Sequence, residues 1–250
     1  MKALITGASS GIGKEMAKIL SDMGYDLILV ARRKKKLEEL KKELKTEITI
    51  IPLDISSSFN CMKLYNKVKD EDIEVIINNA GFGLFGEFNE TNLDKELDMI
   101  DTNIKAVHIL TKQFLNDFIE KDKGYILNVA SLAGFMSGPL MATYYASKNY
   151  VLKLTEAISQ ELKEKGSNIY IGALCPGPVE TEFNDVAKVN FSIKAMSSEK
   201  VASYALDKMF KRKTIIIPGF KMKVLSILYR FVPTKLLLKI NYNIQKKKDV

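Results

Sequence analysis

A tyrosine and a lysine four residues apart, Tyr144 and Lys148, are the side chains in this sequence best suited to move a proton. A free phenol has a pKa of about 10 and is a poor base at neutral pH. Residues at positions i and i+4 lie on one face of a helix, so the ammonium group would lie beside the phenol. An opposite charge lowers the pKa of an acid, and the pair therefore predicts a general acid and base. The adjacent Tyr145 has no lysine at this spacing.

A glycine-rich turn near the start of the chain predicts a site for a pyrophosphate. The run TGASSGIG at 6–13 joins an apolar stretch to an amphipathic one. Backbone N–H groups in such a turn can approach a phosphate, and the following helix contributes the positive end of its dipole. Its three glycines permit the turn, the close approach of the cofactor, and close packing of helix against strand. The candidate cofactor contacts in this turn are Gly7, Ser9, Ser10, Gly11, Ile12 and Gly13.

The residues that follow the second apolar stretch favour NADP(H) over NAD(H). An NAD site has an Asp or Glu there for the ribose 2′-hydroxyl, whereas a 2′-phosphate is bound by arginine. This sequence has Arg32 and Arg33 at that place and no acid before Glu38. We therefore expect NADP(H) as the cofactor, and the arginine pair argues against the alternative, NAD(H).

The order and spacing of these and later motifs resemble the short-chain dehydrogenase/reductase family over about residues 1–217. The turn has the family's TGxxxGxG spacing, an NNAG motif occupies 78–81, and Ser131 precedes Tyr144 by 13 residues. Pro176-Gly177 ends a later apolar stretch, as in that family. The resemblance implies a Rossmann-like fold and hydride transfer between NADP(H) and a carbonyl or secondary alcohol.

The resemblance also implies roles for individual residues. Tyr144 would be the general acid in reduction and the base in oxidation, while Ser131 would bind the substrate oxygen. Lys148 would also hold the nicotinamide ribose, and Asn103 would help keep a water in a proton relay. The expected catalytic residues are Asn103, Ser131, Tyr144 and Lys148. The expected cofactor contacts outside the turn are Arg32, Arg33, Asp54, Ile55, Asn79, Ala80, Gly81, Tyr144, Lys148, Pro176, Gly177, Val179 and Thr181.

Other kinds of catalysis find little support in the sequence. His108 is the only histidine, so a Ser-His-Asp triad would have to recruit it from the middle of a predicted helix. The sequence has no HExxH motif, and its two cysteines, Cys61 and Cys175, form no CxxC motif, so we expect no metal. Two alternatives to an enzyme stay open: a non-catalytic NADP-binding regulator, and a peripheral membrane protein built on a dehydrogenase fold. The tyrosine–lysine pair argues against the regulator.

The elements that must position these residues alternate between short apolar runs and amphipathic stretches. Runs that are apolar throughout are typical of parallel strands covered on both faces. Their alternation with helices predicts a doubly wound α/β sheet of about seven strands, with helices on both faces. The expected strands are 2–6, 26–31, 48–51, 74–78, 124–130, 168–174 and 214–217. The expected helices are 12–23, 34–45, 58–69, 93–121, 142–165 and 198–211.

Length and composition predict a single globular unit with a distinctive tail. The 250 residues are 46% hydrophobic, enough for a sizeable core. We expect a catalytic domain over 1–217 and a helical extension of the same domain over 218–250. The first residues, MKALITG, are too short in apolar length for a secretory signal, and no apolar run reaches the ~18 residues of a membrane span. We therefore expect a cytoplasmic protein.

The net charge of +8 is concentrated in the tail. Residues 211–250 hold eleven of the 38 Lys and Arg and one of the 30 acids, so they carry +10 and the rest carries −2. This distribution predicts an anionic partner surface and no nucleic-acid-binding fold. Met222, Leu225, Leu228 and Val232 share a helix face with basic flanks, which suits a peripheral membrane contact. A lid over the substrate site and a dimer contact suit it equally, and we also expect a homo-oligomer.

Apolar side chains also gather in three segments that should lie at the carboxyl ends of the strands. Ligands bind at that edge of such a sheet. The segments favour an apolar pocket for a lipid-like or aromatic carbonyl, with the loop at 183–196 as its lid. The apolar residues are Phe82, Leu84, Phe85, Phe88, Phe135, Met136, Leu140, Met141, Phe183, Val186, Val189 and Phe191.

Overall fold

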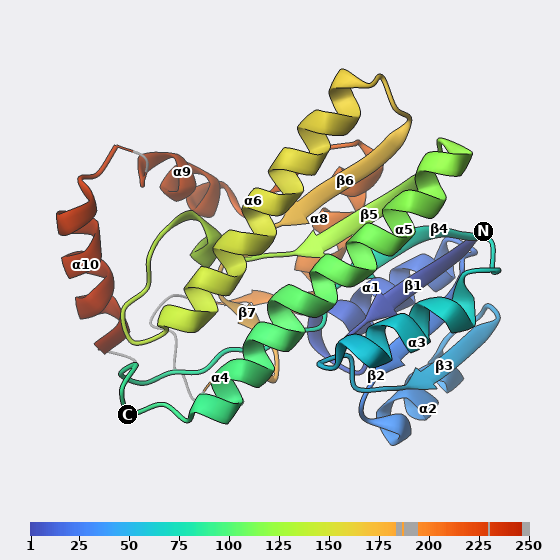
Figure 1. The fold of residues 1–250 in the computed structure, drawn as a ribbon, viewed down its shortest axis with the longest axis horizontal. Coiled ribbons are helices and arrows are strands. Elements are labelled where there is room, and N and C mark those ends of the chain that lie inside the picture. The colour runs from blue at the N-terminus through green and yellow to red at the C-terminus, as the bar shows by residue number, and fades with distance from the viewer. Residues whose placement is uncertain (184–186, 188–194, 230, 247–250) are drawn as a thin grey trace.

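The computed structural model describes residues 1–183, 187, 195–229 and 231–246, and its centre is a parallel sheet (Figure 1). The sheet has seven strands in the order β3-β2-β1-β4-β5-β6-β9, which confirms the predicted doubly wound arrangement. The strands are β1 (Lys2–Thr6), β2 (Asp26–Ala31), β3 (Ile48–Pro52), β4 (Ile73–Asn78), β5 (Gly124–Val129), β6 (Ile169–Leu174) and β9 (Ile215–Ile216).

Helices cover both faces of the sheet. Helices α1, α2 and α8 pack on one face, and α3, α5 and α6 pack on the other. The helices are α1 (Gly11–Asp22), α2 (Lys34–Glu43), α3 (Ser58–Val68), α4 (Leu93–Ile100), α5 (Val107–Lys121), α6 (Ala142–Glu164), α8 (Ser198–Phe210), α9 (Phe220–Leu228) and α10 (Thr234–Lys246). Three elements are too short to have been predicted: the paired strands β7 (Val179–Glu180) and β8 (Met196–Ser197), and the 3-10 helix η2 (Leu132–Phe135).

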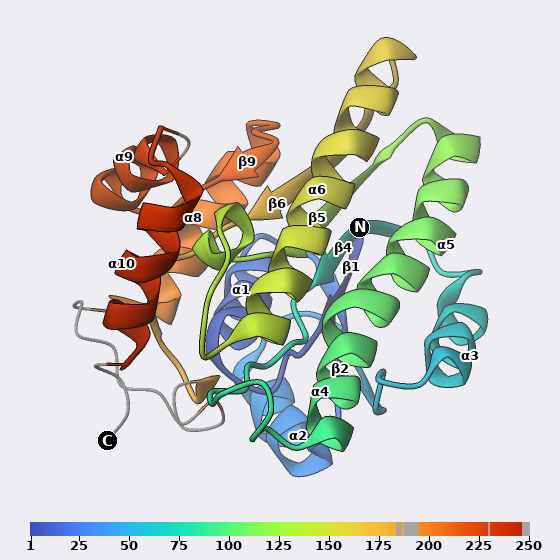
Figure 2. The same ribbon diagram turned by 60° about the vertical axis from the view of Figure 1, so that its left-hand side comes forward.

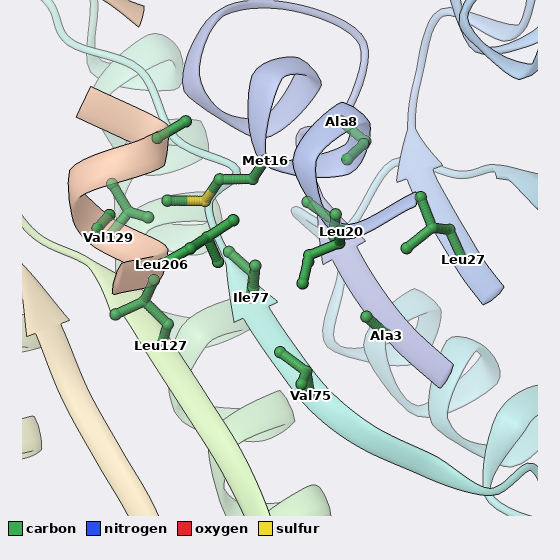
Figure 3. Close-up of a cluster of buried hydrophobic side chains, with 14 of the residues drawn as sticks. Ala3, Ala8, Met16, Leu20, Leu27, Val75, Ile77, Leu127, Val129 and Leu206 are labelled. Carbon is green, nitrogen blue, oxygen red and sulfur yellow. The ribbon is translucent and has the colours of Figure 1, made fainter. Parts of the chain in front are cut away.

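The apolar runs form strands because the helices bury them from both sides. In Figure 3, Met16 and Leu20 of α1 and Leu206 of α8 lie against Val75 and Ile77 of β4, in one buried cluster. Burying each such side chain contributes about 1.5–3 kcal/mol. The central strands are therefore held in place from both faces, and the loops at their carboxyl ends start from rigid positions.

The helix expected over 93–121 is interrupted. Its middle, η1 (Asp101–Ala106), is a π-helix between α4 and α5. Such wider turns are rare and frequently occur at functional sites. The interruption places the buried side chain of Asn103 against the loop that follows β4. Periodicity in the sequence does not reveal this change, because the apolar face continues through it.

The strand order reverses at β1, which has β2 on one side and β4 on the other. Loops that leave β1 and β4 diverge there, and ligands bind in the crevice at such a point. Asn79 ties the two loops together: its Nδ2 donates to the carbonyls of Thr6 (3.0 Å) and Gly7 (3.1 Å). Backbone N–H groups of Asn79 and Ala80 donate to Thr6 Oγ1. The expected cofactor loops are thus neighbours.

Helices α9 and α10 stand together at one end of the molecule, beyond the sheet edge (Figures 1 and 2). Asn241 of α10 is buried and its Nδ2 donates to the Ser137 carbonyl at 2.9 Å, which ties α10 to the main body. Outward-facing apolar side chains include Phe220 and Phe231, 81% and 79% exposed. The exposed lysines of these helices, here called the tail lysines, are Lys221, Lys223, Lys235, Lys239 and Lys246. Within the described ranges, no helix is long and apolar enough to cross a membrane.

Candidate active site

A cavity of about 750 Å³ opens at the carboxyl ends of the strands. Every expected catalytic and cofactor residue lines it except Gly13 and Asn103. A side chain at Gly13 would collide with the Asn79 amide and the Gly7 carbonyl, so this glycine allows helix–loop packing behind the cavity wall. The structure therefore brings the residues of the sequence-based assignment to one cavity, and only Gly13 and Asn103 lie outside its lining.

The glycine-rich turn has the backbone that a pyrophosphate requires. Gly7 and Gly11 adopt positive φ angles of 65° and 55°, which side chains disfavour. A Cβ at Gly7 would lie 2.8 Å from Ala80 Cα, and one at Gly11 would lie 2.9 Å from Thr181 Cγ2. The turn therefore leaves space that a side chain would fill, beside the N-terminus of α1. This space fits the phosphates of a dinucleotide.

Cationic groups lie at the end of β2, where a 2′-phosphate would be bound. Arg33 Nη2 donates to Ser9 Oγ (3.0 Å) and Ser10 Oγ (2.9 Å) and so reaches the glycine-rich turn. Arg32 is 72% exposed, and its Nη1 lies 3.8 Å from Asp54 Oδ2. The arrangement fits a phosphate between the arginines and the turn.

A carboxylate that is distant in sequence already occupies part of this cationic site. Glu182 Oε2 lies 2.7 Å from Arg33 Nη1, and Glu182 Oε1 pairs with Lys36 Nζ. The hydrogen bond from Lys36, helped by those from Arg33 and Ser10, lowers the pKa of Glu182 to about 2. Our sequence argument considered only acids near Arg32 and Arg33 in the chain, and missed Glu182 because the loop after β7 brings it there.

Lys148 is buried beneath the cofactor part of the cavity. Its Nζ donates to the Val129 carbonyl at 2.8 Å, and a Cβ at Gly81 would lie 3.3 Å from it. Burial lowers the pKa of Lys148 to about 8, because the charged form loses its hydration. The ammonium group therefore remains largely protonated at neutral pH, close to the loop after β4.

Tyr144 differs from the expectation in its acidity. Burial raises the pKa of Tyr144 to about 12, and a hydrogen bond with Ser131 opposes the rise. Lys148 Nζ is 6.0 Å from the centre of the Tyr144 ring, and its charge does not offset the burial. The expected lowering of the tyrosine pKa by Lys148 is therefore wrong. Tyr144 is protonated at neutral pH and is a weaker acid than a free phenol.

Ser131 and the neighbouring tyrosines have distinct partners. Ser131 is the N-cap of η2, and its Oγ accepts from the Ala133 N–H at 3.1 Å. Tyr144 shares a hydrogen bond with Ser131, whereas Tyr145 Oη accepts from Gln245 Nε2 of α10. The lysine spacing and the serine contact therefore both favour Tyr144 over Tyr145 as the candidate acid.

Asn103 uses its whole amide group within the protein. Its Nδ2 donates to the Phe82 carbonyl (2.9 Å) and to Ser147 Oγ (3.1 Å), and its Oδ1 accepts from the Phe82 N–H (3.1 Å). These contacts fix the backbone of the loop after β4 relative to α6. The expected participation of Asn103 in a water relay stays a prediction.

The remainder of the cavity is mostly apolar. Of the expected substrate residues, Phe82, Met136, Met141 and Phe183 line it. Phe88 is instead 69% exposed. The others that do not line it are Leu84, Phe85, Phe135 and Leu140. Val186, Val189, Phe191 and most of the expected lid at 183–196 lie outside the described residues.

The C-terminal tail forms a roof over the cavity, a role for which the sequence alone left several alternatives open. The predicted apolar face of Met222, Leu225, Leu228 and Val232 points into the cavity, as a lid would. Helix α10 adds a second set that sequence analysis missed, because its polar members interrupt the apolar pattern. The tail residues that line the cavity are Met222, Leu225, Leu228, Tyr229, Val232, Leu237, Ile240, Asn241, Ile244 and Gln245.

In the part of the chain that the structure describes, neither the histidine nor a metal-binding cluster provides a second candidate centre. His108 is exposed, and its Nδ1 lies 2.7 Å from Tyr150 Oη, outside the cavity lining. The described residues contain no group of three or more His, Cys, Asp or Glu side chains that could hold a metal ion.

Comparisons with known proteins agree with this geometry. The family model for short chain dehydrogenases matches residues 1–190. The chain is 35% identical over 231 residues to an NADP-dependent 3-hydroxy acid dehydrogenase of Schizosaccharomyces pombe, covering 86% of this chain and 88% of the relative.

Solved structures are similar over nearly the whole length. A short-chain dehydrogenase from Sphingobium yanoikuyae in complex with NADPH is 28% identical with a TM-score of 0.82, covering 92% of this chain and 93% of that one. A bulky-bulky ketone specific alcohol dehydrogenase from Comamonas testosteroni is 28% identical with a TM-score of 0.79, covering 92% and 90%. The chain therefore belongs to the short-chain dehydrogenase/reductase family, and is an oxidoreductase that uses NAD(P) to act on alcohol or carbonyl groups.

Proposed function

We propose that this protein is an NADPH-dependent reductase of bulky, apolar ketones. One observation carries the proposal: Tyr144, protonated at neutral pH and hydrogen-bonded to Ser131, lies in a cavity with an apolar roof and a cationic far end. With a pKa of about 12, Tyr144 holds its proton near pH 7, as the donor in carbonyl reduction must, whereas oxidation would need the phenolate.

The cofactor would lie between the glycine-rich turn and the loop after β4. Arg33, Ser9 and Ser10 form a hydrogen-bonded cluster that fits the 2′-phosphate, and Arg32 and Lys36 add positive charge beside it. When bound, the cofactor supplies the hydride. An S. pombe relative named as NADP-dependent and a neighbour solved with NADPH support the preference for the phosphorylated form.

The protein's own residues would supply the proton and hold the substrate oxygen. Tyr144 Oη donates to the carbonyl oxygen, and Ser131 Oγ stabilises that oxygen with a hydrogen bond as its negative charge grows. Lys148, held by the Val129 carbonyl, lowers the free-energy cost of the phenolate left behind. Asn103 keeps the Phe82 backbone in place, and the roof of α9 and α10 limits the access of water.

The cavity's shape and lining support a bulky ketone as the substrate. Its volume, about 750 Å³, suits a cofactor portion plus a sizeable organic molecule. The roof residues are mainly leucine, isoleucine and methionine, which stabilise apolar surface by removing it from water. The structural neighbour described as specific for bulky-bulky ketones supports the same class. We also propose that α9 and α10, within the extension over 218–250, form this roof as part of the same domain as 1–217.

A carbonyl panel read at the nicotinamide absorbance tests the function. Bulky apolar ketones should be reduced with NADPH, and the corresponding alcohols should be oxidised less efficiently at neutral pH. NADPH should bind more tightly than NADH by ~1.5–3 kcal/mol if charged hydrogen bonds set the difference. An Arg32→Ala, Arg33→Ala double variant should lose that preference. Equal affinities for the two cofactors at physiological salt would refute the NADP assignment, and no turnover of any ketone would refute the reductase.

A further inference from the structure

Helix α9 carries a second apolar face that the cavity does not use. Met222 and Leu225 line the cavity on the inner side of this helix. Four further apolar residues are exposed, and their spacing of i, i+4, i+7 and i+8 places them together on one outward face. They are Phe220, Val224, Ile227 and Leu228. Exposed apolar residues normally occur singly on a protein surface, whereas a contiguous stripe is typical of a contact surface.

Helix α10 is divided in the same way. Hydrogen bonds from the buried amides of Asn241 and Gln245 hold its inner side to the main body. Leu236, Ile240 and Ile244 are exposed, and their spacing of i, i+4 and i+8 places them on the adjacent side of the helix. Because the inner side is anchored, this second apolar stripe stays in contact with water.

The two stripes continue into the rim of the cavity. Leu228 of α9 and Ile240 and Ile244 of α10 belong to the stripes and also line the cavity. These side chains are 53%, 40% and 45% exposed, so they provide apolar surface at the edge of the cavity as well as inside it. A partner that covered the stripes would therefore also cover this part of the rim.

The tail lysines accompany both stripes. Two of them lie on α9, and Lys235, Lys239 and Lys246 share one side of α10 at spacings of four and seven residues. No acidic residue occurs between Asp207 and Asp249, so the tail does not neutralise this charge itself. Pairing with a second copy of the same face would bring lysines against lysines, which is unfavourable. The charge therefore favours an anionic partner.

We propose that the outward faces of α9 and α10 dock on an anionic lipid membrane, with the apolar rim of the cavity against the bilayer. The lysines contact the lipid headgroups, and the apolar stripes enter the boundary between headgroups and acyl chains, as amphipathic helices do when they lie in a membrane interface. A lipid surface accommodates both stripes without a complementary shape. This inference does not depend on the proposed reductase function.

Tryptophan fluorescence tests the contact directly, because the chain has no tryptophan of its own. Phe220→Trp on α9 and Leu236→Trp on α10 each place one fluorophore in a stripe but outside the cavity lining. Phe59→Trp is the matched control, at an exposed phenylalanine of α3, which lies far from α9 and α10 in both views (Figures 1 and 2). Vesicles of brominated phosphatidylcholine and phosphatidylserine should quench the two stripe tryptophans and leave the control unquenched.

Lysine variants separate the charge of this surface from the net charge of the chain. Gln at all five tail lysines should weaken binding to these vesicles by about 100-fold, because each lysine near an anionic surface contributes about 5-fold and three in contact suffice. A control with the same net charge replaces five exposed lysines elsewhere by Gln and should bind within about 3-fold of the wild type, since distant charges are screened. The control positions are Lys41, Lys42, Lys112, Lys163 and Lys165.

Each part of the proposal has a result that would overturn it. No quenching of either stripe tryptophan, or equal quenching of the tryptophan at position 59, would overturn the docking. Equal binding of the two lysine variants, or equal binding of the wild type to phosphatidylcholine alone, would overturn the choice of an anionic surface. A blue shift of the stripe tryptophans that grows with protein concentration in the absence of vesicles would assign these faces to a second copy of the chain instead.

Discussion

The carboxylate of Glu182 should weaken NADPH binding, because it occupies the cationic site that the 2′-phosphate needs. Glu182 pairs with Arg33 at 2.7 Å and with Lys36, and it also shares a hydrogen bond with Ser10. A bound phosphate would compete for Arg33 and would be repelled by the carboxylate. Replacing Glu182 by Gln removes the competing charge and keeps the size of the side chain.

The solvent exposure of Glu182, Arg33 and Lys36 sets how strongly Glu182 should oppose phosphate binding. The three side chains are 40–46% exposed, so solvent screens them and the pKa shift of Glu182 overstates their coupling. At about 0.2–1 kcal/mol for each exposed ion pair, plus the serine hydrogen bond, the cluster stabilises the phosphate-free state by ~1–2 kcal/mol. Glu182→Gln should therefore tighten NADPH binding by roughly 5- to 30-fold. NADH has no 2′-phosphate, and its affinity should change by less than about 2-fold.

Fluorescence titration of both reduced cofactors gives the two dissociation constants. Glu180→Gln, at an exposed acid on β7, is the matched control and should leave both unchanged. The gain in NADPH affinity of Glu182→Gln should shrink at about 1 M salt, where charges are screened within ~3 Å. With its pKa near 2, Glu182 stays ionised at neutral and alkaline pH, and the 2′-phosphate, whose second pKa is about 6, is fully ionised above about pH 7.5. The gain in NADPH affinity should therefore not vary between about pH 7.5 and pH 9. An unchanged or weaker affinity for NADPH in Glu182→Gln would refute the competition.

Three further predictions concern the acid, the buried lysine and the tail. Tyr144→Phe should lower kcat by about 10²–10⁴-fold with NADPH binding retained, whereas Tyr145→Phe should have a mild effect by comparison; equal kcat losses would contradict their assignment. Lys148→Met should abolish activity yet raise the free energy of unfolding at pH 7 by ~2 kcal/mol. Burial lowers the lysine pKa from 10.5 to about 8, which corresponds to a cost of ~3 kcal/mol in the folded protein, and the hydrogen bond to the Val129 carbonyl offsets ~1 kcal/mol of that cost. This advantage of the variant in unfolding free energy should fade as the pH rises from 8 to 10.5. In that range the unfolded wild-type chain binds more protons than the folded one, so the stability of the wild type increases with pH. Denaturant unfolding of both proteins at pH 7 and at pH 10.5 measures the change. The protein should co-sediment with vesicles that contain anionic lipid at low salt and should be released at high salt. Replacing the tail lysines by glutamine should prevent this binding. Equal binding to neutral vesicles would refute the electrostatic contact.

Local patterns in the sequence were enough to predict the sheet and to place the proposed cofactor residues at one edge of it. Apolar strands and amphipathic helices follow from periodicity, and the seven-stranded parallel sheet confirms them. The glycine-rich turn, Arg33 and the loop at 79–81 each lie directly after a strand, so their arrival at one sheet edge follows from parallel topology. Tyr144 and Lys148 share one helix, and their common face is likewise a matter of spacing.

Tertiary structure alone decided the features that depend on residues far apart in the chain. Glu182 reaches Arg33, and Gln245 reaches Tyr145, across separations that no local pattern encodes. The acidity of Tyr144 is of the same kind: spacing predicts a cation nearby, but burial by the surrounding elements sets the sign of its pKa shift. The tail sequence shows an apolar face and many lysines, whereas the fold determines that this face covers the cavity. Charge, spacing and periodicity are properties of the chain, but desolvation and long-range contact arise only when the elements pack together.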